Sequence, residues 1–455
     1  MSNLRLYPFQ EIGVAFMREH KKVLLADEMG LGKTVQAIMA TDNFPALIVA
    51  SSGMKYFWRD EIEKWRPGFL VDILDGPYST TADFHIVHWN LLARTYGGGD
   101  PKDRPWNEWV QFLSHVGYGT IIVDEAHKAK NRKAQRTEGL WQLTKTPVQV
   151  MLLTGSPLVN APGDLWALLK CLDPKTYTSY WRFYKEYTLY APTPWSRWSG
   201  EVLGVRNKEK LLAELEPLVI RRTKKTVLPE LPEKLPSQFI HVELYPDQMR
   251  AYNEMVELMI AEIDDETRVL APTVLAQITR LRQICVGFGA FQERDKWPDT
   301  SAAKLDVLCD FLADRDRPVV VASQYKWAVY EAARRLQERL KIRTTTLTGD
   351  TPEAERIEIV AALQEGQIDA LCMTVQTGGE GWTLTAADTI VFLDRPWSPQ
   401  VLNQAIDRLH RIGQENKVHV VSLTSLGTIE DRVEEALARK QDVFNQVFGR
   451  LKELL

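Results

Sequence analysis

The fold of this chain is decided by one stretch, Val23-Leu24-Leu25-Ala26-Asp27-Glu28-Met29-Gly30-Leu31-Gly32-Lys33-Thr34. An apolar segment leads into a glycine-rich turn and then into a helical pattern, which predicts a strand, a loop and a helix. Glycines let the backbone pass close to phosphate oxygens, and the amides at a helix N-terminus attract anions. The stretch therefore predicts a phosphate-binding loop. The full pattern has a glycine where this chain has Asp27, and a chance glycine turn is the alternative.

Each residue type in the loop has a predicted role. Gly30 and Gly32 shape the turn around the phosphates. The Lys33 ammonium is placed to reach the β- and γ-phosphates, and the Thr34 hydroxyl is placed to bind Mg2+.

Two acids follow a second apolar segment, Thr120–Val123. Open parallel sheets bind ligands at the carboxyl ends of their strands, which is where Asp124 and Glu125 would lie. Asp124 is predicted to hold Mg2+, and Glu125 to orient and deprotonate an attacking water. A strand that ends in two acids is common, so this interpretation gains its force from the phosphate-binding loop upstream.

Composition and charge exclude several classes of protein. The 455 residues are 45% hydrophobic and 25% charged, which excludes collagen-like, disordered and disulfide-scaffold chains. The formal net charge of −4 excludes a wholly basic nucleic-acid coat protein. Residues 1–225 carry 30 Lys and Arg against 24 Asp and Glu, whereas residues 226–455 carry 26 against 36. The net charge of the whole chain is therefore the sum of a positive first half and a negative second half.

The cysteine spacing and the lengths of the apolar runs predict the cellular compartment of the protein. Neither a zinc site nor a disulfide framework is predicted, because no two of the four cysteines have C-x-x-C spacing. No apolar run approaches the roughly 18 residues of a membrane helix, and the N-terminus lacks the apolar core of a signal peptide. We expect a cytoplasmic protein with no membrane partner and with buried thiols. The cysteines are Cys171, Cys285, Cys309 and Cys372.

Short apolar runs alternate with helical patterns, which is typical of parallel α/β domains. At roughly 100–200 residues per domain the length predicts two to four domains. We expect two, residues 1–225 and 226–455, joined near residues 221–235, where Pro229 and Pro232 oppose helix and sheet. Helical insertions are expected at about 171–215 and about 244–285, and a C-terminal helix at about 429–455. Expected strands are Val23–Ala26, Ala46–Ala50, Thr120–Val123, Val148–Leu153, Val319–Ala322, Thr344–Leu347, Ala370–Met373, Thr389–Leu393 and Val418–Leu423. Expected helices include Thr34–Thr41, Pro246–Asp264, Ala271–Cys285, Lys326–Leu340 and Pro352–Gln364.

A pair of arginines stands near the end of the second half. The segment Gln404–Gln414 looks helical up to Gly413, so Arg408 and Arg411, three residues apart, would share one helix face. Two guanidiniums on one face could reach a γ-phosphate as arginine fingers. An ordinary solvated face is the alternative, and the phosphate-binding loop in the other half favours the fingers.

Further motifs stand in order along nearly the whole chain. They are Leu6–Gln10, Asp27–Thr34, Leu47–Ser51 with Trp58, Glu61 and Trp65, Asp124–His127 with Lys130-Asn131, Leu153–Asn160, Ile220–Lys224 with Leu231–Lys234, Thr377–Gly381, Trp397–Pro399 and Gln404–Gln414. With these motifs the chain resembles the SWI/SNF-type DNA-dependent ATPases, a branch of helicase superfamily two with a DEAH box. Departures from the family's motifs are few, at Ser156, Trp382-Thr383 and Ser398.

The resemblance implies a fold and a set of contacts. The fold is α/β, with two RecA-like P-loop NTPase lobes that have parallel sheets and helical insertions. ATP and Mg2+ bind between the lobes, Gln10 reads adenine, and Gly381 and Gln404 belong to the nucleotide motifs. Nucleic-acid contacts are implied at Ser51, Ser323, Gln324, Thr377, Thr383 and Trp397.

Two basic segments lie in the positive half or at its border. Lys128–Arg136 holds five basic residues and no acid, and Arg221–Lys225 holds four in five. Such clusters neutralise phosphates in a sequence-independent, salt-sensitive way, and Lys130, Arg132 and Lys133 are our candidates for that contact. A solvated charged face is the alternative.

Nine aromatic residues crowd into residues 177–198. A platform for stacked bases is one interpretation. Tyr180, Tyr184 and Tyr187 recur at spacings of four and three, which equally predicts a buried helix face. We favour packing, because the resembled family places a helical protrusion here.

The predicted function is ATP-driven translocation along duplex DNA, with remodelling of DNA or of protein–DNA complexes; single-stranded DNA is a second candidate partner. A strand-separating DNA or RNA helicase is one alternative. An ATP-bound clamp or scaffold without turnover is another, which intact Lys33, Glu125, Arg408 and Arg411 speak against. No accessory domain is visible, which suits a prokaryotic or viral protein, and no protein partner is indicated.

Overall fold

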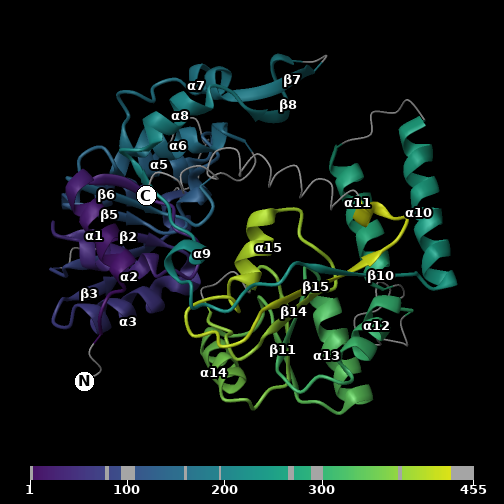
Figure 1. Ribbon diagram of the computed structural model, residues 1–455. Coiled ribbons are helices and arrows are strands. Elements are labelled where there is room, and N and C mark those ends of the chain that lie inside the picture. The colour runs from purple at the N-terminus through teal and green to yellow at the C-terminus, as the bar shows by residue number, and fades with distance from the viewer. Residues whose placement is uncertain are drawn as a thin grey trace. The chain divides into compact units, whose positions relative to one another are not determined.

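The computed structural model describes residues 4–76, 81–93, 108–157, 161–193, 196–264, 271–287, 301–377 and 382–431. The described residues divide into two compact units, one within Met1–Pro229 and the other within Glu230–Ala438. Each unit is built on a parallel sheet with helices on both faces (Figure 1). The predicted α/β class with two parallel sheets is confirmed. No described helix is long and apolar enough to cross a membrane.

The sheet of the first unit has seven strands in the order β3-β4-β2-β5-β6-β1-β9, and every neighbouring pair is parallel. Its central strands are continuous apolar runs because both faces of the sheet are covered. The strands are β1 (Lys22–Leu25), β2 (Ala46–Ala50), β3 (Val71–Ile73), β4 (Phe84–His88), β5 (Thr120–Val123), β6 (Gln149–Leu153) and β9 (Val219–Ile220).

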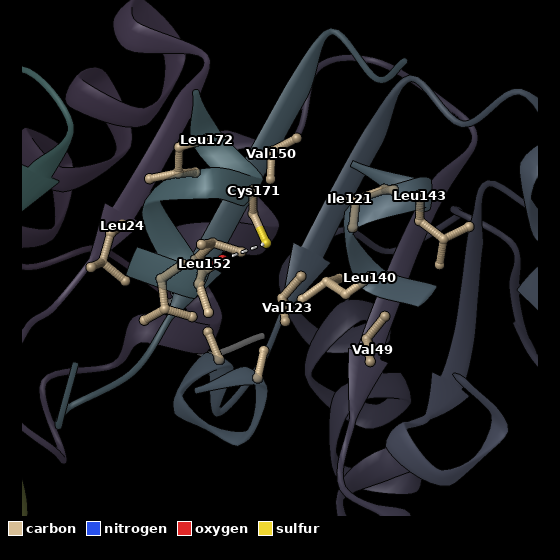
Figure 2. Close-up of a cluster of buried hydrophobic side chains, with 14 of the residues drawn as sticks. Leu24, Val49, Ile121, Val123, Leu140, Leu143, Val150, Leu152, Cys171 and Leu172 are labelled. Atoms are coloured by element: carbon tan, nitrogen blue, oxygen red, sulfur yellow. Dashed lines mark hydrogen bonds between the residues drawn. The ribbon is translucent and has the colours of Figure 1, made fainter. Parts of the chain in front are cut away.

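Alternate residues of these strands enter two separate cores. On one face, Leu25 and Ile48 pack with Trp58 of α3 and with helices α1 and α2. On the other face, Leu24, Val123 and Leu152 pack with helices α4, α5 and α6 (Figure 2). The helices are α1 (Pro8–His20), α2 (Lys33–Ala40), α3 (Lys55–Trp65), α4 (Glu108–Val116), α5 (Gln135–Leu143) and α6 (Gly163–Leu172).

The insertion at residues 171–215 differs from the expected all-helical structure. Between α7 (Tyr180–Tyr187) and α8 (Lys208–Leu215) lies an antiparallel hairpin, β7 (Thr188–Thr193) and β8 (Ser196–Val205). Neither strand has the strict apolar–polar alternation by which a strand is predicted from sequence. Phe183, Tyr184 and Tyr187 are buried, as expected for a packing face, and the Tyr187 hydroxyl donates to Glu214 Oε1 at 2.6 Å.

The sheet of the second unit has six parallel strands in the order β10-β15-β14-β11-β13-β12. Helices α12 and α13 pack on one face and helices α14 and α15 on the other. The strands are β10 (Gln238–Val242), β11 (Val319–Ser323), β12 (Thr344–Leu347), β13 (Ala370–Thr374), β14 (Thr389–Phe392) and β15 (His419–Ser425). The helices are α10 (Pro246–Asp264), α11 (Ala271–Val286), α12 (Ala303–Leu312), α13 (Lys326–Leu340), α14 (Glu353–Gln364) and α15 (Pro399–Ile406).

Helices α10 and α11 lie where the long helices of residues 244–285 are expected. The expected C-terminal helix at about 429–455 lies outside the described residues from residue 432 onward. All four cysteines are free and buried. The Cys171 thiol, in the core of the first unit, donates to the carbonyl of Ala167 at 3.4 Å (Figure 2).

The central position of β6 makes a prediction about stability. Leu152 is fully buried, so Leu152→Ala should lower the free energy of unfolding by about 2–5 kcal/mol through lost contacts and a cavity. Val148, one residue before β6, is 57% exposed, so the control Val148→Ala should change it by less than about 0.5 kcal/mol. Urea denaturation of both variants measures the difference, and equal losses would contradict the assigned core.

Candidate functional site

The predicted phosphate-binding loop connects β1 to α2. Gly30 and Gly32 have φ of 84° and 70°, in the left-handed region that glycine tolerates best. A Cβ on Gly32 would also lie 2.4 Å from Gln10 Nε2. The Lys33 ammonium donates to the carbonyls of Asp27 at 2.9 Å and Glu28 at 3.2 Å, so the loop curves around its own lysine.

Gln10 lies directly beside this loop. Its Nε2 donates to the carbonyl of Leu31 at 3.2 Å, and its Oε1 accepts from the backbone N–H of Tyr7 at 3.0 Å. The side chain is buried. The N-terminus of α1 is thereby tied to the loop.

Strand order brings the two acids to the same edge of the sheet. β1 neighbours β6 and β6 neighbours β5, so the loops after these three strands meet. Asp124 Oδ2 accepts from the Trp58 indole N–H at 3.0 Å, and Asp124 Oδ1 accepts from the backbone N–H of Glu125 at 2.9 Å. Burial and then the charge of Glu125 raise the pKa of Asp124 to about 6, while the Trp58 hydrogen bond and Lys33 oppose that rise.

The hydrogen bond from Trp58 to Asp124 was not predicted from the sequence. Trp58 was recognised only as part of a motif, without a role, because an indole gives no sign of its partner 66 residues away. Trp89 adds a second indole, which donates to the carbonyl of Asp124 at 3.0 Å. The two tryptophans hold the acid from its side chain and from its backbone.

Glu125 adopts a left-handed backbone, with φ of 48° and ψ of 49°. Its Oε2 lies 3.2 Å from His127 Nδ1, which also lies 3.1 Å from the hydroxyl of Thr154 at the end of β6. The carboxylate is therefore steered by the last residue of the D-E-A-H segment and, through it, by the neighbouring strand.

The donor set suits a magnesium ion that is shared with phosphate. Mg2+ is usually bound by one or two protein oxygens together with substrate phosphates and water. Asp124, directly after β5, and Thr34, in the first turn of α2, offer such oxygens. Within the described ranges no group of three or more His, Cys, Asp or Glu could hold a metal by itself. These residues therefore fit a cation whose coordination a nucleotide completes.

One basic segment is organised at the same sheet edge. Lys128 Nζ donates to the hydroxyl of Ser51 at 2.6 Å, which joins the ends of β5 and β2. Lys130 is half-buried and Lys133 exposed. The Arg132 guanidinium lies 4.5 Å from the ring centre of Tyr180. Sequence reasoning separated the basic segment from the aromatic one, whereas the structure brings them together.

The other basic segment, Arg221–Lys225, is largely buried within the first unit. Arg221, Arg222 and Lys224 are 8% or less exposed, which corrects the expectation of a phosphate-binding patch over Arg221–Lys225. Arg222 forms an ion pair with Asp27, the residue that replaces the first glycine of the loop. The basic residues of this segment therefore form part of a buried network of polar contacts.

The second unit places its predicted nucleic-acid residues unequally. Ser323 and Thr377 are buried, with hydroxyls that contact Asp394 and Thr374, so both are withdrawn from the surface on which DNA is expected. The Gln324 amide also donates to Asp394, at 2.7 Å. Thr383 and Trp397 are half-buried, and the Arg282 guanidinium lies 5.3 Å from a ring centre of Trp397.

The predicted arginine fingers are not on a helix. α15 ends at Ile406, so the expectation of a helix up to Gly413 with Arg408 and Arg411 on one face is wrong. After Ile406 the backbone N–H groups of Arg408 and Leu409 donate three residues back and that of His410 four residues back, and the Gln414 amide donates to the carbonyls of Ala387 and Leu409. Gln404 lies within α15, and Gly381 lies outside the described residues. The guanidinium of Arg411 donates to the carbonyl of Trp382 at 3.2 Å.

Known proteins match this chain over most of its length. The SNF2-related domain matches residues 9–288, and the helicase conserved C-terminal domain matches residues 303–413. The DNA annealing helicase and endonuclease ZRANB3 of Homo sapiens is 28% identical, over 99% of this chain and 41% of that protein. The putative ATP-dependent helicase/translocase YwqA of Bacillus subtilis is also 28% identical, over 97% of this chain and 48% of that protein. A solved Sulfolobus solfataricus SWI2/SNF2 ATPase core in complex with dsDNA is 24% identical, covers 99% of this chain and 94% of that chain, and has a TM-score of 0.44.

The phosphate-binding loop and the acids at one edge of a parallel sheet define a P-loop NTPase. The chain belongs to the family of SNF2-related domains, whose match covers more than half of it. It spans less than half the length of the two curated relatives named above.

The backbone of Glu125 makes a prediction that is independent of chemistry. A residue with a Cβ is strained in the left-handed region, so Glu125→Ala should be less stable than Glu125→Gly by about 1 kcal/mol. Both variants lack the carboxylate, which leaves the backbone as the difference between them. Urea denaturation measures it, and an alanine variant as stable as the glycine variant would contradict the left-handed assignment.

Proposed function

We propose that this chain is an ATP-dependent motor that hydrolyses ATP while it tracks along duplex DNA and remodels DNA or protein–DNA complexes. One observation carries the proposal, which is the meeting of the phosphate-binding loop, Asp124 and Glu125 at one sheet edge. Membership of the SNF2-related family supports it, as do the translocase and helicase names of the relatives.

The residues of the first unit divide the work. Lys33 binds the β- and γ-phosphates, and the backbone amides at the start of α2 orient them. When bound, Mg2+ supplies positive charge that stabilises the phosphates during transfer to water. Thr34 and Asp124 hold the ion, and Trp58 holds Asp124. Glu125, steered by His127, orients the attacking water and accepts its proton. Gln10 reads the base.

The second unit completes the machinery in this proposal. Arg408 and Arg411 offset charge on the γ-phosphate, and Gln404 and Gly381 belong to the same nucleotide motifs. The guanidiniums of Arg408 and Arg411 would be presented by the tight turn after α15. Gly413, with its left-handed backbone, and the buried Gln414 amide stabilise that turn. The first unit is thus the nucleotide-binding lobe, about residues 1–225, and the second is the helicase-type lobe.

DNA contact is proposed to be local and salt-sensitive. Lys130, Arg132 and Lys133 lie in the net-positive half and would neutralise phosphates of one strand, and the Ser51 hydroxyl would donate a hydrogen bond to a phosphate oxygen. Gln324, Thr383 and Trp397 are the remaining candidates in the second unit. A duplex is the proposed substrate, and the name of the solved SWI2/SNF2 core in complex with dsDNA is in keeping with it.

Two variants test the proposal. Lys33→Ala removes the phosphate-binding ammonium and Glu125→Gln removes the base, so each should lower the ATPase rate at least about 100-fold. Duplex DNA binding should remain measurable in both, because neither residue belongs to the proposed DNA surface. Lys145→Ala, which removes an exposed lysine of the same unit, is the matched control and should hydrolyse ATP normally. Retained hydrolysis in the first two variants would contradict the assignment.

A further inference from the structure

An acid stands where the phosphate-binding loop pattern has a glycine, and it is completely buried. Asp27 is 0% exposed at the end of β1. Its Oδ1 accepts from Arg222 Nε at 3.0 Å, and its Oδ2 accepts from Arg222 Nη2 at 2.5 Å. The backbone N–H of Arg222 also donates to Oδ1, at 3.0 Å. The pair is bidentate, the geometry in which an arginine binds a carboxylate most strongly.

The Arg222 guanidinium gathers the other elements of the nucleotide site. Its Nη1 donates to the carbonyl of Phe9 in α1, and its Nη2 donates to Gln36 Oε1 in α2 at 2.7 Å. The Gln36 amide donates in turn to Asp27 Oδ2 at 3.1 Å and to the carbonyl of Leu31 at 3.2 Å. One side chain therefore holds the start of α1, the loop and α2 together.

The backbone after β9 runs alongside the loop. The N–H of Glu28 donates to the carbonyl of Arg222 at 2.9 Å, and the N–H of Lys224 donates to Glu28 Oε2 at 2.8 Å. The guanidinium of Arg221 donates to the carbonyl of Ala26 at 3.0 Å. The short helix α9 (Lys224–Val227) follows, and Pro229 is the last residue of the first unit before the chain continues into the second. The segment that leaves the first unit is thus bonded to the phosphate-binding loop.

The network packs closely against Gly13 of α1. A Cβ on Gly13 would lie 2.0 Å from Gln36 Oε1 and 2.6 Å from Arg222 Nη2. A lysine at position 222 would keep the charge, but its single ammonium cannot donate along the four directions that the planar fork uses. Both the charge and the shape of Arg222 are therefore required.

We propose that Arg222 is a positioning residue for the phosphate-binding loop, and that through it nucleotide in the loop orders residues 221–228, which lead out of the first unit. The inference rests on the proposed function, because it takes the triphosphate of ATP as the ligand of the loop. Arg222 contacts no nucleotide in this account. It acts by restricting the loop to the conformation that binds phosphate.

Loss of the Arg222 contacts should weaken nucleotide binding more than it slows ATP hydrolysis. A loop that has lost its anchor must be ordered at the expense of binding free energy, so nucleotide binds more weakly. Once nucleotide is bound, Lys33, Asp124 and Glu125 still hold their places. A variant of Arg222 should therefore raise KM and leave kcat nearly unchanged.

The first experiment compares Arg222→Lys with Lys225→Gln, which removes a charge from the exposed end of the same segment. Affinity is measured by titrating the full chain with a fluorescent, non-hydrolysable ATP analogue in the presence of Mg2+. Arg222→Lys should bind about tenfold more weakly than wild type, with KM for ATP raised to a similar extent. Lys225→Gln should match wild type. Wild-type affinity in Arg222→Lys, or a fall in kcat with KM unchanged, would overturn the proposal.

The second experiment uses the wild type and does not depend on a variant that folds. Amide hydrogen exchange is followed with and without the same analogue. The amides of Arg222 and Lys224, which donate to Asp27 and Glu28, should exchange more slowly when the analogue is bound. If the analogue binds and these amides are unaffected, the inference fails while the proposed function stands. If the wild type neither binds the analogue nor hydrolyses ATP, the proposed function itself fails.

Discussion

The parallel pairing of β1 with β6 on one side and β9 on the other places the phosphate-binding loop beside the ends of those two strands. Parallel strands end at the same edge, so the phosphate-binding loop, Thr154 and the segment that begins at Arg221 all emerge together. β5 follows β6 in the sheet and adds Asp124 and Glu125. The site is thus a consequence of strand order, and its side chains only refine what the sheet has brought together.

The groups that meet at this edge carry costs that the surrounding fold offsets. Glu125 holds a left-handed backbone, and Asp124 has a pKa raised to about 6 by burial and by its neighbour. Strain and perturbed pKa values gather at functional sites because the rest of the fold can hold them. Here Trp58 supports Asp124 through a hydrogen bond, and His127 lies within ion-pair distance of Glu125.

Sequence reasoning succeeded where the signal is local. Strands such as Ala46–Ala50 and Thr120–Val123 were predictable because a sheet covered on both faces leaves continuous apolar runs. The phosphate-binding loop was predictable because its glycines, lysine and threonine stand at fixed spacing. The hairpin Thr188–Val205 was missed because the aromatic residues just before it, Tyr180, Tyr184 and Tyr187, suggested a helix face for the whole insertion.

Sequence reasoning failed where partners are distant in the chain. Arg222 and Asp27 are 195 residues apart, so nothing in the run of basic letters showed that its first residues are buried. The burial of Ser323 was equally unpredictable, since its partner Asp394 lies 71 residues away. Nothing in the helical pattern of Gln404–Gln414 shows that α15 ends at Ile406, or that the Gln414 amide donates to the carbonyls of Ala387 and Leu409, which lie in a loop and a turn. Hydrogen bonds of this kind are fixed by the fold, which periodicity does not reveal.

The proposed ATP-driven motor on duplex DNA is tested most directly by the steady-state ATPase rate of the full chain. The rate is measured with no nucleic acid, with duplex DNA, with single-stranded DNA and with RNA. We expect slow hydrolysis by the protein alone and a clear stimulation by duplex DNA, because the phosphate-binding site and the basic segment share one sheet edge. Stimulation by RNA alone, or no hydrolysis under any of the four conditions, would contradict the proposal.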